Sequence, residues 1–274
     1  MERVDTEWLA LRAGIKPGIR VSADVVSAPA IAERYQRFGC SVVMTHGRIG
    51  LERRPRVLLY IGGTPQAAAG LRAAEAHLLD PKTTPRDKAF FTREFGARLG
   101  YPRCCVDAFA ERTRRGSGLL RDGDRDRHDP DYVHVHEAWV PRPDWRLNNL
   151  LMAHHIRLIS FAPCRFDCAS ALAQAQAIHR LVGLESADLL PVLEDRLRRP
   201  LVVGPDGARA WVRLDRNKIA AVEPPREPDG PPSQPSPTDL ARTPAWSGAD
   251  VTAEGRVQAR GEPPPRLLDF ASVR

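Results

Sequence analysis

Four cysteines in two short stretches constrain this chain more than any other feature of its sequence. Cys104 and Cys105 form one pair, Cys164 and Cys168 form the other, and each pair begins one or two residues after a proline. Each pair also opens a stretch with helical patterning, so two helix starts far apart in the sequence are expected to present thiolates to one centre. Clustered cysteines in a reducing compartment bind metal or do redox chemistry more often than they form structural disulfides.

The length and composition limit the size, domain number and location of the protein that carries this site. A chain of 274 residues, 42% of them hydrophobic, can bury a substantial core as one large domain or two small ones. No stretch approaches eighteen consecutive apolar residues, and the first residues lack the basic and then apolar pattern of a signal peptide. We therefore expect a cytoplasmic protein that has no membrane partner.

The formal charge of +7 favours anionic partners in general. The basic residues are not packed into one run, however, and arginine greatly outnumbers lysine, as is typical of a high-GC bacterial genome. Nucleic acid is thus the less favoured partner on composition alone. A small-molecule substrate and a redox partner protein are the partners that a cysteine site favours.

The periodicity predicts an α/β (or α+β) fold with four regions. These are a small mixed N-terminal sheet with helices, a helical core that carries the cysteines, a C-terminal β-hairpin and a disordered tail. The corresponding domain boundaries are 1–82, 83–223 and 224–274, and the last segment is rich in Pro, Ser, Gly and charge. Strands are expected at 18–26, 40–45, 56–61, 156–161, 201–203, 210–214 and 219–222. Helices are expected at 29–38, 66–79, 84–99, 102–114, 145–155, 164–184 and 189–197.

The spacing of the cysteines bears on what they bind. Cys164 and Cys168 are four apart and would face one side of a helix. Cys104 and Cys105 point about 100° apart on a helix and converge only near its end. An iron-sulfur cluster, [4Fe-4S] in our first hypothesis, tolerates such divergence and is commonly held by four thiolates. Zinc is the alternative, although four-cysteine zinc sites generally use pairs separated by two to four residues. Inert buried cysteines are the third possibility.

The same residues resemble a known family. The motif Gly-Tyr-Pro-x-Cys-Cys-Val at 100–106, followed by Pro-Cys-x-x-x-Cys at 163–168, is similar to the paired motif of the prokaryotic domain of unknown function 483 family and its relatives. The resemblance covers about residues 93–177 and is specific at the cysteines. Members often have a histidine two before the Pro-Cys pair, where this chain has Phe161. The resemblance implies a shared cysteine site and no particular reaction.

Several polar residues near the cysteines are candidates for chemistry. His155 could act as acid or base, and Arg103 and Arg165 flank the cysteines and suit an anionic substrate such as a carboxylate or phosphate. The structural alternatives are that His155 lies at a helix C-terminus, where histidine is favoured, and that the two arginines only balance the charge of the site.

The remaining candidates each have an equally ordinary structural explanation. His134 and His136 would share a face of a strand and could bind metal or shuttle protons. Asn148, Asn149 and His154 could line a pocket beside the cysteines, or form a helix face and its C-terminal end. Asp107 and Asp167 could accept hydrogen bonds near the cysteines, or carry charge at helix starts. Cys40 lies in an apolar segment, and we expect it to be buried and inert.

Two functions from different classes follow from these observations. The first is an iron-sulfur enzyme that acts on a small polar, anionic substrate by redox, lyase or desulfuration chemistry beside Cys104, Cys105, Cys164 and Cys168. The second is a zinc-stabilised binding or accessory protein that contacts a partner or nucleic acid through a basic surface. Histidine and arginine side chains converging on the cysteines would favour the enzyme, and a closed tetrahedral site would favour the binding protein.

Overall fold

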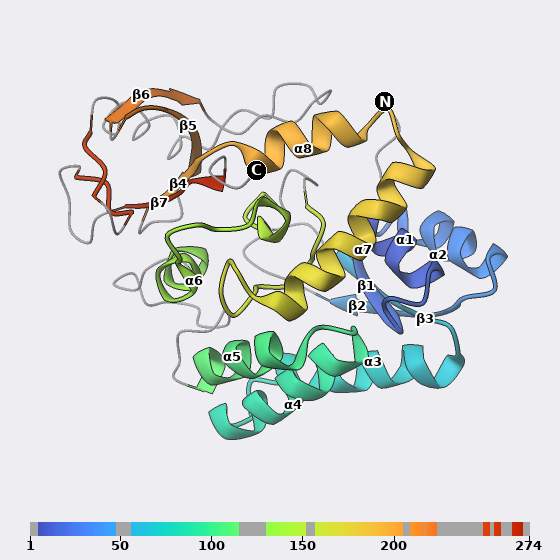
Figure 1. Ribbon diagram of the computed structural model, residues 1–274. Coiled ribbons are helices and arrows are strands. Elements are labelled where there is room, and N and C mark those ends of the chain that lie inside the picture. Colours follow the sequence, from blue (N-terminus) through green and yellow to red (C-terminus); the bar gives the residue numbers. More distant parts are fainter. Residues whose placement is uncertain are drawn as a thin grey trace. The chain divides into compact units, whose positions relative to one another are not determined.

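The computed structural model describes residues 5–47, 56–114, 130–151, 157–204, 209–216, 218–223, 249–252, 255–258 and 265–270. Within these ranges the chain has the predicted mixed α/β character, with eight α-helices and two small antiparallel sheets (Figure 1). Its contacts divide into an N-terminal unit, Glu7–Gly116, and a C-terminal unit, Met1–Thr6 with Ser117–Arg274. Compactness does not show which segments fold alone, so the domain boundaries expected at 82–83 and 223–224 stay predictions.

The N-terminal unit is built on a three-stranded sheet in the order β1-β3-β2. β1 (Gly18–Asp24) and β2 (Ser41–Gly47) both pair antiparallel with the central β3 (Arg56–Gly62). The apolar run of β3 is explained by its position, because both of its faces are covered. Val57, Leu59 and Ile61 lie in one buried cluster, whereas Leu58 and Tyr60 lie in another.

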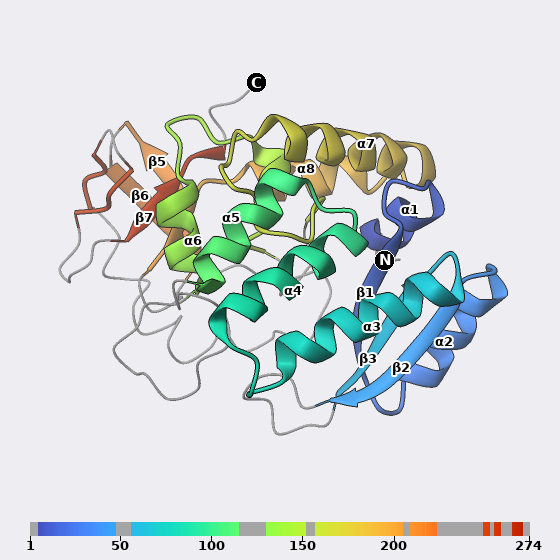
Figure 2. The ribbon, with the colours of Figure 1, turned by 90° about the horizontal axis from the view of Figure 1, so that it is seen from below.

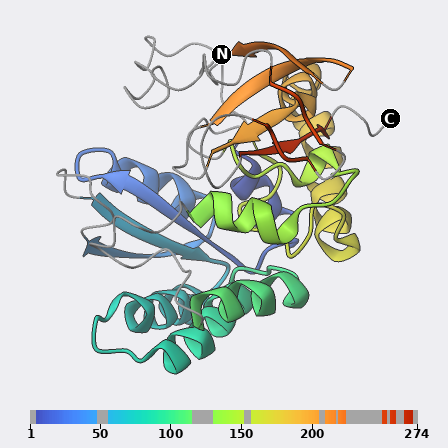
Figure 3. The same ribbon diagram turned by 90° about the vertical axis from the view of Figure 1, so that its left-hand side faces the viewer.

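Helices supply the two covers of this sheet, on opposite faces (Figure 3). α1 (Thr6–Arg12) and α2 (Ala28–Arg37) cover one face with Trp8, Leu11 and Tyr35. α3 (Pro65–Leu79) and α4 (Pro85–Arg98) cover the other with Leu71 and Leu99. α1 was not among the helices predicted from the sequence, and it is a short helix in which only Arg12 is exposed.

The starts of α3 and α4 follow the same sequence logic. The Thr64 side chain accepts a hydrogen bond from the Ala67 amide, and Thr84 accepts one from the Asp87 amide. A proline comes first in each helix, where its missing N–H costs nothing. Thr64 thus caps α3 and Thr84 caps α4.

α4 ends in a turn that leads directly into α5 (Arg103–Arg114). Gly100 has φ 73°, and the Tyr101 amide donates to the Gly96 carbonyl at 3.0 Å, which is the bonding of a Schellman motif. α3, α4 and α5 run side by side (Figure 2). The packing of α4 on α5 is close, since a Cβ at Gly96 would lie 2.7 Å from a γ-carbon of Val106. The turn and this contact fix the first residues of α5.

The C-terminal unit joins helices to the second sheet. Its helices are α6 (Pro130–Ala138), the 3₁₀ helix η1 (Trp145–Leu147), α7 (Ala169–Glu185) and α8 (Leu190–Arg198). The sheet runs β6-β5-β4-β7, all antiparallel, with β4 (Leu201–Val203) and β5 (Arg209–Asp215) forming the predicted hairpin. β6 (Lys218–Glu223) extends it as expected.

Part of the predicted tail belongs to this sheet. β7 (Arg266–Leu268) pairs antiparallel with β4, and Ala249, Val257 and Leu267 lie in the buried cluster of the sheet. The Trp139 indole N–H donates to the Leu267 carbonyl at 3.1 Å. Three-residue strands separated by prolines carry too little periodicity to stand out in a segment of this composition. Residues 224–248 and 271–274 lie outside the described part of the chain.

Four local predictions in residues 130–168 are wrong. The helix expected from Cys164 begins at Ala169, so Cys164 and Cys168 do not share a helix face. Residues 157–161 are not a strand, and of the helix expected at 145–155 only η1 forms within 145–151. His134 and His136 lie in α6 and not in a strand. The alternation Val-His-Val-His imitates a strand, but the buried residues are His134, Val135 and Ala138, a helical spacing.

None of the helices within the described ranges is long and apolar enough to cross a membrane.

Candidate metal centre

The first cysteine pair lies in the first turn of α5. The amides of Cys105 and Val106 both donate to the Pro102 carbonyl, at 2.9 and 3.0 Å, so the helix is already regular there. The Cys104 and Cys105 sulfur atoms are nevertheless only 3.9 Å apart. Cys104 is exposed, whereas Cys105 is buried at 1% exposure. Two adjacent cysteines of one helix can therefore face a common centre, with one ligand on the outer side.

The second pair brackets a turn that leads into α7. Cys164 lies in a bend, the Cys168 amide donates to the Arg165 carbonyl at 3.1 Å, and Cys168 is the N-cap residue of α7. The Leu172 amide then donates to the Cys168 carbonyl at 2.9 Å as the first helical bond. Both sulfur-bearing residues are half-buried. The two cysteines are held by a turn and a helix start, not by one helix face.

Phe166, between the two cysteines, anchors this turn. Its side chain is fully buried and packs 5.3 Å from the His134 ring and 5.8 Å from the Phe270 ring. Its amide donates to the Ala138 carbonyl at 3.0 Å, and its carbonyl accepts from the Asp144 amide at 2.7 Å. The sequence signal for this anchor is a single apolar residue between two charged neighbours, Arg165 and Asp167. This signal was not recognised in the sequence.

The four thiols form one group. The sulfur atoms of Cys104, Cys105, Cys164 and Cys168 all lie within 4.8 Å of one another. All four are free thiols, with no disulfide among them. The predicted four-cysteine group is thus confirmed as a set of ligands that can hold a metal ion or cluster.

The spacing of the sulfur atoms tests which metal group they fit. A tetrahedral zinc site with Zn–S bonds of about 2.3 Å has sulfur atoms about 3.8 Å apart. The Cys104–Cys105 separation of 3.9 Å matches that edge closely. In a multi-iron cluster the four thiolates point outward from different irons, and their sulfur atoms are spread more widely than around one ion. The sulfur spacing fits a single tetrahedral ion better.

Helix termini favour negative charge at these residues. Cys104 and Cys105 lie in the first turn of α5, and Cys168 caps α7, so both pairs adjoin the positive end of a helix dipole. Four thiolates around a divalent ion carry a net charge of −2, which free amides and helix dipoles stabilise. The helix start predicted at the first pair is confirmed, whereas at the second pair the helix begins only at Ala169, with Cys168 as its N-cap and Cys164 in the turn before it.

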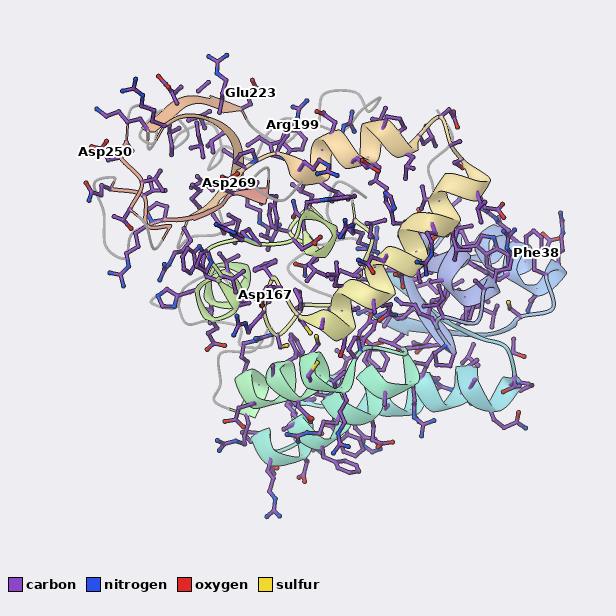
Figure 4. The ribbon with its side chains drawn as sticks, viewed as in Figure 1. Phe38, Asp167, Arg199, Glu223, Asp250 and Asp269 are labelled. Atoms are coloured by element: carbon purple, nitrogen blue, oxygen red, sulfur yellow. The ribbon has the colours of Figure 1, made fainter. Side chains whose placement is uncertain are left out.

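The two flanking arginines are bound to carboxylates. The Arg103 side chain is 97% exposed, and its Nε lies 3.7 Å from Asp107, whose other oxygen accepts from Arg93 at 2.8 Å. Arg165 donates to both oxygens of Asp167 at 2.8 and 2.9 Å (Asp167 is labelled in Figure 4). The hydrogen bond with Asp167 raises the pKa of Arg165, and the neighbouring Cys164 and Cys168 add to this shift.

These pairings bear on the candidate catalytic residues. Asp107 and Asp167 hold arginines, so their role here is the balance of charge near the cysteines. A substrate role for Arg103 or Arg165 stays a prediction, and it would require the anion to compete with these carboxylates. His154 and His155 lie outside the described residues.

The remaining polar candidates are mostly structural. Asn148 is fully buried, donates to the Leu197 carbonyl at 3.1 Å and accepts from the Leu150 amide at 3.3 Å. Asn149 is also buried. His134 packs on Phe166, whereas His136 is exposed. Asn148 therefore closes a chain turn against α8 and does not lie on the helix face that its structural alternative predicted.

Cys40 stands apart from the four-cysteine group. It packs at the edge of the cluster formed by α1, α2 and the first sheet, and burial raises the pKa of its thiol. It is half-buried where the sequence predicted a buried residue. A raised pKa leaves less thiolate at neutral pH, which agrees with the inert role expected for it.

Comparisons with protein-family models, with curated proteins and with solved structures give no match to this chain. The resemblance to the domain of unknown function 483 family therefore stays a prediction that rests on the cysteine motifs.

Proposed function

We propose that the chain is a zinc-stabilised binding or accessory protein in which Cys104, Cys105, Cys164 and Cys168 hold one zinc ion. The observation that carries this proposal is the 3.9 Å separation of the Cys104 and Cys105 sulfur atoms, the edge of a single tetrahedron. The 4.8 Å limit for the whole group supports it. This reverses the order of the two candidates that the sequence spacing alone favoured.

The chemistry of such a site is structural. Four thiolates saturate a zinc ion and leave no open position, which catalytic zinc sites keep for water or substrate. The ion would tie residues 104–105 to residues 164–168, and its binding energy would add to the stability of the folded state. The arginines nearest the thiols bind carboxylates of the same helix or turn, which is the arrangement expected of a charge-balanced structural site.

An iron-sulfur enzyme remains the second candidate, and one observation favours it. Cys104 is exposed at the outer side of the group, and Arg165 lies close enough to Cys164 and Cys168 for their charge to act on it. An anionic substrate reaching that side would meet a guanidinium. This candidate requires the sulfur atoms to spread on cluster binding, with His155, Arg103 and Arg165 in catalytic roles. Membership of the domain of unknown function 483 family and a cytoplasmic location belong to the proposal for either candidate.

Matched cysteine variants test the proposal. Cys168→Ser should lose the metal and lower the thermal midpoint, because three thiolates bind zinc less tightly than four. Cys40→Ser is the control, since Cys40 lies outside the group, and it should keep about one zinc per chain. Metal content is measured by mass spectrometry on the intact protein under native conditions. Full zinc occupancy in Cys168→Ser would remove that residue from the site.

A further inference from the structure

The charge of the chain is divided unevenly between its two units. Residues 7–116 contain 19 basic and 10 acidic residues, a formal charge of +9, whereas the rest of the chain has 22 basic and 24 acidic residues, −2. Per residue, the first part is richer in basic residues, with 19 in 110 against 22 in 164, and poorer in acidic residues, with 10 in 110 against 24 in 164. Such asymmetry is typical of proteins that bind polyanions.

The acidic side chains of residues 7–116, the basic unit, already bind neighbouring groups. Six of its described acids pair with cations, as in Lys16–Glu7, Arg20–Glu75 and Arg98–Glu94. The other three, Asp24, Asp80 and Asp87, accept hydrogen bonds in turns and helix caps. The cations that remain are therefore not neutralised by these acids.

Three such cations lie on the hairpin of α3 and α4. Lys82, Arg86 and Lys88 make no ion pair with any residue that the structure describes. Residues 65–98 as a whole contain six basic and four acidic residues, so the hairpin is positive. Arg86 and Arg93 are seven apart on α4 and share its outer face.

Aromatic rings lie among these cations. Phe90 stands between Arg86 and Arg93 on the same stripe of α4, and its side chain is 56% exposed. Next to it, Phe91 stacks on His77 of α3 at 4.1 Å with the rings nearly parallel, and Phe90 meets Phe91 edge-on at 5.3 Å. An exposed phenylalanine beside a stacked pair offers a face on which a base can stack.

We propose that the outer face of the α3–α4 hairpin binds single-stranded nucleic acid, with Lys82 and Arg86 on phosphates and Phe90 stacking on a base. The proposal rests on the binding-protein function proposed above and names its partner. Interleaved cations and exposed rings are the combination by which proteins hold single strands without reading their sequence. A smooth anionic surface or a folded acidic protein would use the cations and not the rings.

Fluorescence anisotropy on the full metal-loaded chain tests this, with a labelled oligothymidylate of about 12 nucleotides. The wild-type chain should bind with an affinity that falls with salt by about 0.7 log units per log unit of salt for each phosphate contacted. Lys82→Gln combined with Arg86→Gln should make that slope shallower by about 1.4, for two lost contacts. Phe90→Ala should weaken binding about tenfold and leave the slope unchanged.

Arg34→Gln combined with Arg37→Gln is the matched control. It removes two charges from exposed positions of α2, which covers the opposite face of the same sheet, and should change neither affinity nor slope by more than about twofold. Equal losses in the α2 and hairpin variants, or no binding by the wild type, would overturn the proposal. Heparin binding with the same affinity as the oligonucleotide, and with no loss of that affinity in Phe90→Ala, would also overturn it. Metal content is recorded for every variant, so the fate of the zinc site is judged separately from this surface.

Discussion

The contact between α4 and α5 offers a quantitative test, because it holds the first cysteine pair. In Gly96→Ala the new Cβ would lie 2.7 and 2.9 Å from the two γ-carbons of Val106, well inside contact distance. Rotation of the Val106 side chain cannot relieve both overlaps at once, since each alternative staggered rotamer still places one γ-carbon at one of these two positions. The helices would have to separate, and overpacking of this kind costs about 1–3 kcal/mol.

The helix preference of alanine opposes this cost. Alanine in place of glycine inside a helix stabilises by about 1 kcal/mol, so the net loss expected for Gly96→Ala is about 0–2 kcal/mol. Gly183→Ala in α7 is the matched control, because its nearest neighbour beyond the helix backbone is Leu190 Cδ2 at an ordinary 3.4 Å. It should stabilise the chain by up to about 1 kcal/mol. Urea unfolding with the metal bound gives both free energies.

A double variant isolates the contact. Val106→Ala alone should cost about 1–3 kcal/mol for the lost burial, but the space it opens accommodates the methyl group that Gly96→Ala introduces. The combined change should therefore be less destabilising than the sum of the two by at least about 1 kcal/mol. Strict additivity would refute the close approach of α4 and α5 at this point. Because Val106 directly follows Cys105, Gly96→Ala should also speed the release of metal to a chromogenic chelator.

Other predictions concern the second cysteine pair, the C-terminal strands and the fifth cysteine. Phe166→Ala should lower stability by about 3–5 kcal/mol and weaken metal binding in competition titrations, because the ring fixes the turn between Cys164 and Cys168; wild-type affinity would show that the turn is held by other contacts. Truncation after Glu223 removes β7 and should lower the thermal midpoint by several degrees, whereas an unchanged midpoint would return that segment to a dispensable tail. Burial raises the pKa of Cys40, so at about pH 7.5 iodoacetamide should label it several-fold more slowly than a model thiol, with the rate rising as pH increases; alkylation of Cys40 at the model-thiol rate, read by peptide mass spectrometry, would contradict this.

Much of the N-terminal unit could be predicted because its local signals agree. The continuous apolar run at residues 56–61 matches a strand covered on both faces. Thr64 with Pro65 starts α3 as such a pair should. Gly100 ends α4 because the Schellman turn requires a residue with positive φ, which glycine adopts without steric strain. These elements depend on residues close in sequence.

The second half was harder to predict because distant contacts decide it. Residues 164–168 have helical composition, yet burial of Phe166 against His134 and Phe270 and its backbone bonds to Ala138 and Asp144 hold a turn instead. β7 is too short to carry a period of its own, and it is ordered by pairing with β4. The cysteines were found from spacing alone, but the proposal of one ion rather than a cluster rests on a sulfur–sulfur distance that a sequence does not contain.

Metal and acid-labile sulfide analysis, with an absorption spectrum, on protein purified without oxygen tests the central claim most directly. One tetrathiolate ion predicts about one zinc per chain, no sulfide and no visible colour. About four irons with matching sulfide and a brown chromophore would contradict it. That result would also mean that the four sulfur atoms stand further apart in the loaded protein than the 4.8 Å within which they lie here.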